Sequence, residues 1–178
     1  MKNVLIISTS IRAGSNSEKL AHEFEKGAKE AGNAVKFISL KDKNIAFCKG
    51  CLACQKLHRC VIEDDANAIA DQICESDVIV WASPIYYYEM SGQMKTLIDR
   101  ANSLYSRDYR FKEVYFLTTA AEEEEHVPEK AISGLQGWID CFEGVELKKT
   151  LFVGGMNGPN EINNNEKLKQ AYELGRRI

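Results

Sequence analysis

The sequence lacks any long uninterrupted apolar run, and it has no excess of positive charge. No stretch approaches the roughly 20 apolar residues that a membrane-spanning helix needs, so we expect no contact with a membrane. Its 23 lysine and arginine residues are outnumbered by 26 acidic residues, which gives a formal net charge of −3. Because the basic residues are scattered, nucleic acid is not expected as a partner. The first three residues lead directly into a strand pattern without a signal peptide, so we expect a cytoplasmic protein.

Two common nucleotide-binding signatures are also missing from the polar turn at residues 8–17. The turn has neither the Gly-Lys-Ser/Thr ending of a Walker A motif nor a GxGxxG pattern. It is nevertheless rich in hydroxyl groups, and it joins the apolar run at residues 4–7 to a helical pattern. A helix start offers unpaired backbone N–H groups and the positive end of the helix dipole. A simple N-cap needs only one polar side chain, whereas this turn has several. The turn therefore predicts a phosphate site made by Ser10, Arg12, Ser15, Asn16 and Ser17.

The periodicity of the chain predicts one domain, residues 1–178, in which five strands alternate with helices. We expect strands at residues 4–7, 35–40, 78–82, 114–117 and 151–153. We expect helices at residues 17–31, from the acidic residues 63–65 to about 76, at 91–104, at 131–142 and from about 160 onward. Such alternation favours an open parallel sheet with helices on both faces. A long connection that contains a cysteine loop, residues 45–62, is inserted after the second strand.

Two further unusual loops follow strand ends, and ligands of such sheets bind beyond the carboxyl ends of the strands. The loop that begins at Ser83 contains a rigid proline and three tyrosines, which suit a flat aromatic ligand. The same tyrosines could instead cap the core with their hydroxyls in water. The loop after the fourth strand begins Thr118-Thr119-Ala120 and continues into four glutamates, which are expected to be solvated.

Four of the six cysteines lie close together, with the spacing C-x2-C-x2-C-x5-C from Cys48 through Cys51 and Cys54 to Cys60. Such clustering indicates metal or redox chemistry before a structural disulfide framework. The spacing fits a small inorganic cluster. Zinc with His58 as a spare ligand, a redox dithiol and plain thiols remain alternatives. The other two, Cys74 and Cys141, are expected to be buried on helix faces.

Together these motifs resemble the flavodoxin-like NAD(P)H-dependent FMN reductases, close to the iron–sulfur flavoproteins. The string Ser-x-Arg-x-x-Ser-Asn-Ser at residues 10–17 is similar to their phosphate loop, with Thr9 in place of the usual Gly and Ile11 where Pro is common. The string Ser-Pro-x-Tyr, followed by Ser-Gly-x-Met-Lys at residues 91–95, resembles their flavin loop. The resemblance implies a single-domain flavodoxin-like three-layer sandwich (α/β) with a five-stranded parallel sheet in the order 2-1-3-4-5.

The resemblance also implies where an FMN cofactor would bind. Its phosphate would lie on the loop of residues 10–17. Its ring would lie along the second loop and its pyrimidine edge near the third, so that the expected ring contacts are Ser83, Pro84, Ile85, Tyr86, Tyr87, Thr118, Thr119 and Ala120. No side chain needs to act as a general acid or base, because the flavin carries the chemistry.

For the cysteines, the resemblance implies a [4Fe–4S] cluster held by Cys48, Cys51, Cys54 and Cys60. Many related reductases have a similar loop without a cluster. Their gap before the last cysteine is usually longer, which favours the cluster in this chain.

The predicted function is that of an FMN-dependent oxidoreductase that passes electrons from NAD(P)H or a redox partner to a flavin, quinone or protein acceptor. An electron carrier without NAD(P)H turnover, of the iron–sulfur flavoprotein or flavodoxin type, is the alternative. The mild net charge of −3 argues against a flavodoxin, since flavodoxins are strongly acidic. The resemblance implies a homodimer or homotetramer.

Overall fold

The computed structural model describes residues 1–178 and contains a parallel sheet with the strand order β2-β1-β3-β5-β6. The strands are β1 (Asn3–Ser8), β2 (Ala34–Ser39), β3 (Val78–Tyr86), β5 (Glu113–Thr119) and β6 (Glu146–Val153). A two-residue strand, β4 (Glu89–Met90), pairs antiparallel with the end of β3 as a hairpin return. Without β4 the five parallel strands have the order 2-1-3-4-5, so the predicted flavodoxin-like topology is confirmed.

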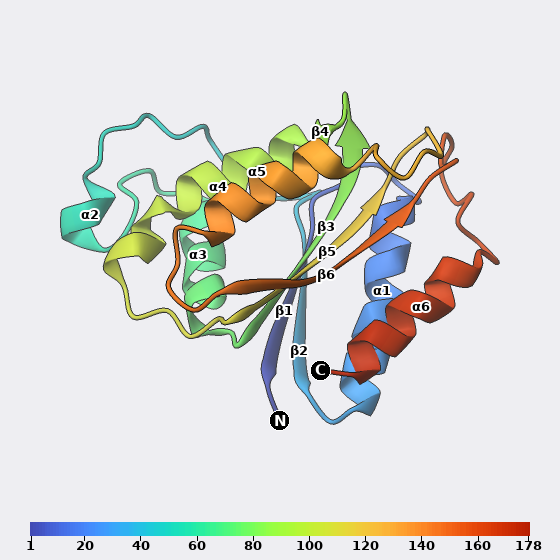
Figure 1. Ribbon diagram of the computed structural model, residues 1–178. Helices are drawn as coiled ribbons and strands as arrows, with labels where there is room; N and C mark the ends of the chain where they lie inside the picture. Colours follow the sequence, from blue (N-terminus) through green and yellow to red (C-terminus); the bar gives the residue numbers. More distant parts are fainter.

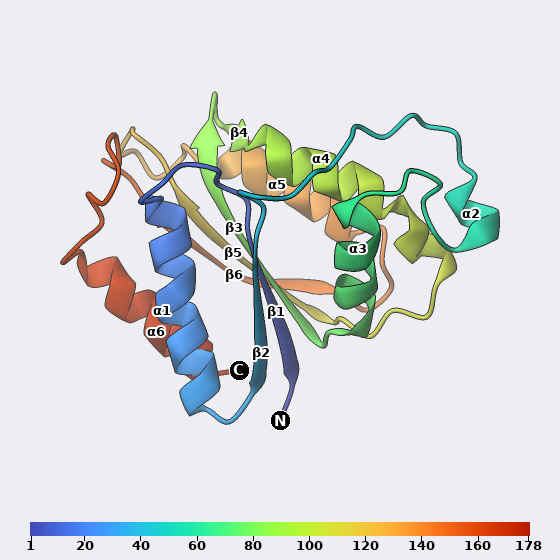
Figure 2. The same cartoon turned by 180° about the vertical axis from the view of Figure 1, so that it is seen from behind.

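Helices cover both faces of the sheet and make a three-layer sandwich (Figures 1 and 2). One outer layer contains α1 (Asn16–Glu30) and α6 (Glu166–Arg176), and the other contains α3 (Asp65–Glu75), α4 (Gly92–Arg100) and α5 (Glu129–Ile139). A single turn, α2 (Cys54–Leu57), lies in the long connection after β2, and the 3₁₀ helix η1 (Ala101–Ser106) continues α4. None of these helices combines the length and the apolar character that a membrane crossing requires.

The central strands are buried on both faces, as their unbroken apolar sequences predict. Side chains along β1 alternate between two cores: Leu5 and Ile7 face α3–α5, whereas Val4 and Ile6 face α1 and α6. The β3 residues divide in the same way, with Trp81 in the larger core. Burial therefore fixes the register of the inner strands, and this register brings their carboxyl ends to one edge.

The outer elements depart from the sequence prediction more than the inner ones. β6 begins at Glu146 rather than at residue 151, because its first half is an exposed, lysine-rich edge without an apolar signal. α6 begins at Glu166, since residues 159–164 form turns. The expected burial of Cys141 is wrong: α5 ends at Ile139, and the thiol two residues later is exposed. Cys74 is buried as expected.

Candidate functional site

A small cavity of about 120 Å³ lies where the loops after β1, β3, β5 and β6 meet. It brings together residues from all three loops that the sequence singled out. The lining residues are Ser10, Arg12, Ser15, Asn16, Pro84, Ile85, Tyr86, Thr119, Ala120, Ala121, Met156 and Asn157. The cavity is therefore lined by nine of the residues that were predicted to bind FMN.

The polar end of the cavity is the start of α1. Ser15 is the N-cap of this helix, and its hydroxyl accepts a hydrogen bond from the Glu18 N–H at 3.3 Å. The hydroxyls of Ser15 and Ser17 lie 3.1 Å apart, and both side chains are buried. The backbone N–H groups of the first helical turn have no carbonyl partner within the helix. Buried hydroxyls and free N–H groups at a helix start make a site for an anion.

Arg12 adds a cation at the rim of this cavity. Its guanidinium donates to the carbonyl oxygen of Asn157 at 3.0 Å, while its backbone N–H donates to the Ser10 hydroxyl at 3.3 Å. The side chain is exposed and is in no ion pair with a carboxylate. Its remaining N–H donors are thus available for a phosphate group.

The segment after β6, residues 156–163, closes the cavity from the far side, and we call it the strap. The Asn16 amide donates to the carbonyl oxygen of Gly158 at 2.8 Å, and its side-chain oxygen accepts from the Ile162 N–H at 3.2 Å. The Asn160 N–H donates to the carbonyl oxygen of Gly14 at 2.9 Å. Asn16, which the sequence predicted as a phosphate contact, therefore joins the phosphate loop to the strap.

The strap is the part of the site that the sequence reasoning missed, although Met156 and Asn157 line the cavity. A signal was available. The strap follows the last parallel strand, whose carboxyl end must lie at the same edge as the others. Its residues carry no motif, so nothing in their types marked them as contacts.

The aromatic loop forms a tight hairpin at the opposite side of the cavity. Tyr86 pairs with Glu89, and the two residues between them, Tyr87 and Tyr88, have φ values of 51° and 66°. Two left-handed residues in a two-residue loop are typical of a type I′ turn, which favours Gly or Asn. The turn holds Tyr87 98% exposed at its tip. Backbone strain at such a position is typical of functional sites.

A second, mostly apolar cavity of about 250 Å³ adjoins the first, since the two share Ile85, Ala120 and Ala121. Tyr87 and Tyr88 also line this second cavity. Tyr88 is tied to the loop after β5: its hydrogen bond with Glu122 raises the pKa of the phenol, and its ring stacks on His126. The site thus offers a polar anion end that continues into an apolar, aromatic end.

Two predicted cofactor residues, Ser83 and Thr118, lie beneath the cavity instead of lining it. The Thr118 hydroxyl donates to the carbonyl oxygen of Ser83 at 2.7 Å, and the Ser83 hydroxyl accepts from the Ser91 N–H at 3.0 Å. Both side chains are fully buried. Their hydrogen bonds hold the ends of β3 and β5 and the start of α4 in place under the site.

The four clustered cysteines belong to the long connection around α2. This connection projects beyond α3 and beyond the end of α4 that lies opposite to β4 (Figures 1 and 2). Cys48 and Cys51 are exposed, Cys54 and Cys60 are half-buried, and none is in a disulfide. The thiols are not gathered: the structure contains no group of three or more potential ligands at metal-binding distances. The Asn102 side chain donates to the Cys54 sulfur at 3.2 Å, which attaches α2 to η1.

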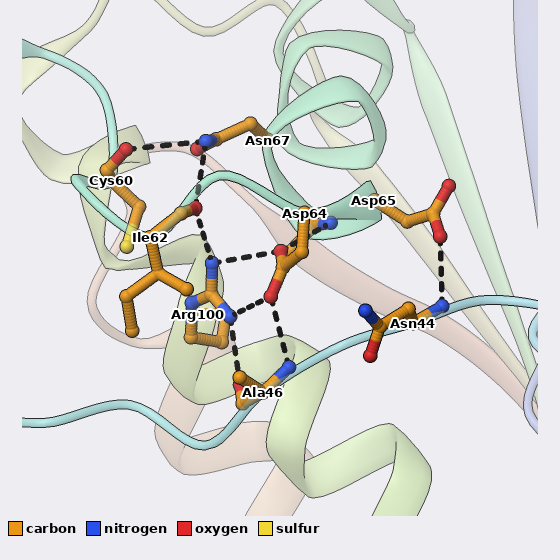
Figure 3. A network of polar contacts seen from close by, with 9 residues as sticks. Asn44, Ala46, Cys60, Ile62, Asp64, Asp65, Asn67 and Arg100 are labelled. Atoms are coloured by element: carbon orange, nitrogen blue, oxygen red, sulfur yellow. Dashed lines mark hydrogen bonds and ion pairs between the residues drawn. The ribbon is translucent and has the colours of Figure 1, made fainter.

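The base of the cysteine loop is held by a buried ion pair, shown in Figure 3. The Arg100 guanidinium makes two hydrogen bonds to the Asp64 carboxylate, at 2.6 and 2.9 Å. It also donates to the carbonyl oxygens of Ala46 and Ile62. Burial opposes the charge of Arg100, but the hydrogen bonds with Asp64 and the nearby Cys60 thiol together raise the pKa of the guanidinium. The Arg100 Nε atom is buried without a hydrogen-bond partner.

The residues at both places fit the cofactors that the sequence implied. The cavity edge combines buried hydroxyls, a helix start and Arg12 with an apolar aromatic continuation, which suits a phosphate joined to a flat ring system. At the cysteine loop, the four free thiols have the donor chemistry of an iron–sulfur site, and an unpartnered Nε donor beside Cys60 suits an anionic sulfur.

The sheet order, the helical layers and the ligand edge define a flavodoxin-like protein. Residues 2–134 match the model of the NADPH-dependent FMN reductase family, and the chain belongs to this family. An iron–sulfur flavoprotein of Methanosarcina thermophila is 31% identical over 151 residues, which cover 84% of this chain and 79% of the relative. Another from Archaeoglobus fulgidus is 29% identical over the whole chain and 79% of the relative.

The fold is also that of known structures. The NAD(P)H:quinone oxidoreductase of Methanothermobacter marburgensis superposes with a TM-score of 0.76 over 99% of this chain and 95% of its own. The two sequences are only 20% identical, so this likeness shows the fold alone.

Proposed function

We propose that the protein is an FMN-dependent oxidoreductase that passes electrons from NAD(P)H or a redox partner to a flavin, quinone or protein acceptor. One observation carries the proposal: a polar cavity at the start of α1 continues into an aromatic cavity beside the β3–β4 hairpin. Family membership over residues 2–134 supports the same conclusion.

In this proposal the chain binds and orients FMN, and the bound flavin supplies the electron-transfer chemistry. Ser10, Ser15, Ser17 and Arg12 bind the phosphate group with the free N–H groups of α1. Pro84, Ile85 and Tyr86 provide the wall for the ring, whose pyrimidine edge lies near Thr119 and Ala120. Asn16 fixes the phosphate loop to the strap, and Ser83 and Thr118 fix the loops from below.

The cysteine loop is proposed to hold a [4Fe–4S] cluster through Cys48, Cys51, Cys54 and Cys60, which would supply one-electron chemistry. The curated relatives named iron–sulfur flavoprotein support this assignment. Because the thiols are spread over an exposed loop, cluster binding requires the loop to draw its sulfurs together. Metal analysis of protein purified without air tests it, and a protein with zinc or no metal would contradict it.

The double variant Arg12→Ala plus Ser17→Ala tests the flavin site. We expect it to lose most of its FMN while it keeps the wild-type circular dichroism spectrum. The variant removes the exposed cation and a buried hydroxyl of the phosphate end, whereas the sheet beneath keeps its packing. Flavin content is measured from the visible spectrum and from titration of the apoprotein with FMN.

Arg177→Ala plus Ser133→Ala is the matched control, since both residues are exposed and neither lines the cavity. This control should bind FMN like the wild type. Equal flavin content in the two double variants would contradict the proposed site. NADH or NADPH oxidation with free FMN or a quinone then separates an enzyme from an electron carrier, which would show no turnover.

A further inference from the structure

Arg100 and Asp64 form the most deeply buried ion pair of the protein, with side-chain exposures of 0% and 4%. Such a pair is expensive to desolvate, and removal of one partner is strongly destabilising because it leaves the other charge buried and uncompensated. Burial opposes the charge of Asp64, but hydrogen bonds from Arg100 and from the N–H groups of Ala46 and Ala66 lower the pKa of its carboxyl. The pair is therefore fully charged at neutral pH.

The contacts of this pair fall at the two ends of the cysteine loop (Figure 3). At the entrance, Arg100 donates to the Ala46 carbonyl at 2.7 Å, and the Ala46 N–H donates to Asp64 at 2.9 Å. At the exit, Arg100 donates to the Ile62 carbonyl at 3.0 Å. One guanidinium at the end of α4 thus joins two positions that are 16 residues apart in the chain.

The loop between these two ends has no core of its own. No residue from 41 to 63 is fully buried, and the exposed residues include Phe47, Leu52 and Leu57. Without apolar burial, the position of such a segment depends on its polar anchors. The buried Asn67 side chain donates only to the carbonyl oxygens of Cys60 and Ile62 at the exit. The Arg100–Asp64 pair contacts both ends of the loop, so it sets how far apart they lie.

The Nε side of the Arg100 guanidinium is directed toward Cys60, the last cysteine of the loop. Two guanidinium nitrogens are used by Asp64 and the two carbonyls, but Nε is buried and unpartnered. In Figure 3 the Cys60 sulfur lies on the side of the guanidinium away from Asp64. An orphaned buried donor is costly, and an anionic sulfur at this place would satisfy it.

We propose that Arg100, held by Asp64, is the positioning residue of the cysteine loop: it closes the loop at its base and directs Nε–H toward the sulfur of Cys60. This inference rests on the proposed cluster for its second half, because hydrogen bonds to the sulfurs help to set the reduction potential of an iron–sulfur cluster. The closing of the loop is independent of any cluster.

Limited trypsin digestion of the purified protein tests the closing of the loop, since Lys49, Lys56 and Arg59 are exposed cleavage points within it. Asp64→Asn and Arg100→Lys should be cut in the loop at least about tenfold faster than the wild type. Asp64→Asn leaves the buried guanidinium without its counter-charge, and a lysine ammonium cannot reproduce the contacts of the guanidinium with Asp64 and both carbonyl oxygens. Glu63→Gln is the matched control. It removes a carboxylate next to Asp64 in the sequence, but the ion pair of Glu63 with Arg59 is exposed to solvent.

The Arg100→Lys variant also distinguishes a hydrogen bond from Nε to the Cys60 sulfur from a purely structural role of Arg100. It keeps the positive charge but loses the Nε donor, so its reconstituted cluster should have a more negative reduction potential than that of Glu63→Gln. Iron and sulfide content, redox titration followed by electron paramagnetic resonance, and FMN content are measured on the same samples. FMN content and circular dichroism identify a variant that has not folded. If Arg100→Lys does not fold, the digestion of Asp64→Asn tests the closing of the loop.

The possible results are distinct for the two proposals. Cleavage of Asp64→Asn and Arg100→Lys at the rate of Glu63→Gln would overturn the closing of the loop. An unchanged potential in Arg100→Lys would overturn the donor to Cys60. A wild-type protein that takes up no iron would overturn the proposed cluster and with it the donor, while the digestion rates would still decide the closing of the loop.

Discussion

At the residue scale, Asn16 shows how one side-chain amide can hold two distant segments of a binding site together. Its donor and its acceptor are both used by the strap, through Gly158 and Ile162. The phosphate loop, which belongs to the N-terminal end of the chain, is thereby fixed by a segment near the C-terminal end. The geometry of the anion end depends on this bridge as much as on the hydroxyls that face the cavity.

Replacement of Asn16 by Ala should lower the free energy of unfolding by about 1–3 kcal/mol, because the buried Ile162 N–H loses its acceptor. It should also weaken FMN binding, since the loop and the strap separate. Urea unfolding and FMN titration measure the two effects. Asn163→Ala, which removes only an exposed contact with Lys19, should stay within about 0.5 kcal/mol of the wild type. Equal losses in both variants would contradict the bridge.

Asp64 gives a second prediction at this scale, for acid stability. Its pKa is lower in the folded chain than the ordinary value of 3.8, so the folded protein binds fewer protons than the unfolded chain. The stabilisation is therefore fully present above the unfolded pKa and is lost as the pH falls through the folded value. From about pH 5 to about pH 2, the wild type should lose more unfolding free energy than Asp64→Asn. Parallel stability curves of the two proteins would contradict this prediction.

At the scale of elements, α1 and α6 come together through two glycines. A Cβ atom on Gly27 would lie 2.0 Å from the Tyr172 carbonyl oxygen, and one on Gly175 would lie 2.1 Å from that of Phe24. The backbones of the two helices are thus in direct contact. This contact sets the position of α6, and the strap leads directly into that helix.

Gly27→Ala and Gly175→Ala should each destabilise the protein by about 1–3 kcal/mol, because the added methyl group meets backbone that cannot move aside. In a free helix the same change would stabilise by up to about 1 kcal/mol. Gly137→Ala in α5 is the control: a Cβ there meets no atom within 4 Å, so the variant should be as stable as the wild type or more so. Thermal and urea unfolding of the three variants show whether each substitution raises or lowers the free energy of unfolding.

At the scale of the whole molecule, large apolar side chains remain exposed on the site edge and on the cysteine loop. Phe47 is 80% exposed and Tyr87 98%. The cysteine loop exposes Leu52 and Leu57 as well as Phe47, and exposed apolar groups that gather on one region are typical of interaction surfaces. A homodimer or homotetramer that covers them is the expected state in solution.

Sedimentation velocity tests this expectation. The wild type should sediment as a dimer or tetramer, and Phe47→Glu should shift it toward smaller species, because a charge replaces an exposed apolar ring. Lys49→Glu, a nearby exposed substitution of the same loop, should leave the assembly unchanged. A wild-type monomer would contradict the prediction.

The features that the sequence predicted well are those with a strong local signal. The unbroken apolar runs of β1 and β3 mark strands buried on both faces, and the predicted helix at residues 17–31 agrees within one residue with α1. The edge strand β6 was predicted too short, since its lysine-rich half has no such signal. Cys141 was misplaced because helical spacing was extended past the end of α5.

By itself, the sequence determined through the alternation of strands and helices that the sheet is parallel with helices on both faces, and it marked the loops that carry donors. The strand order was implied by the family resemblance. Tertiary structure alone decided that Asn16 bonds to the strap, that Met156 and Asn157 line the cavity, and that Arg100 joins the ends of the cysteine loop. The physical reason is the range of the interactions. Hydrophobic period and capping act over a few residues, whereas these contacts join residues 38 to 146 positions apart, which only the packed sheet brings together.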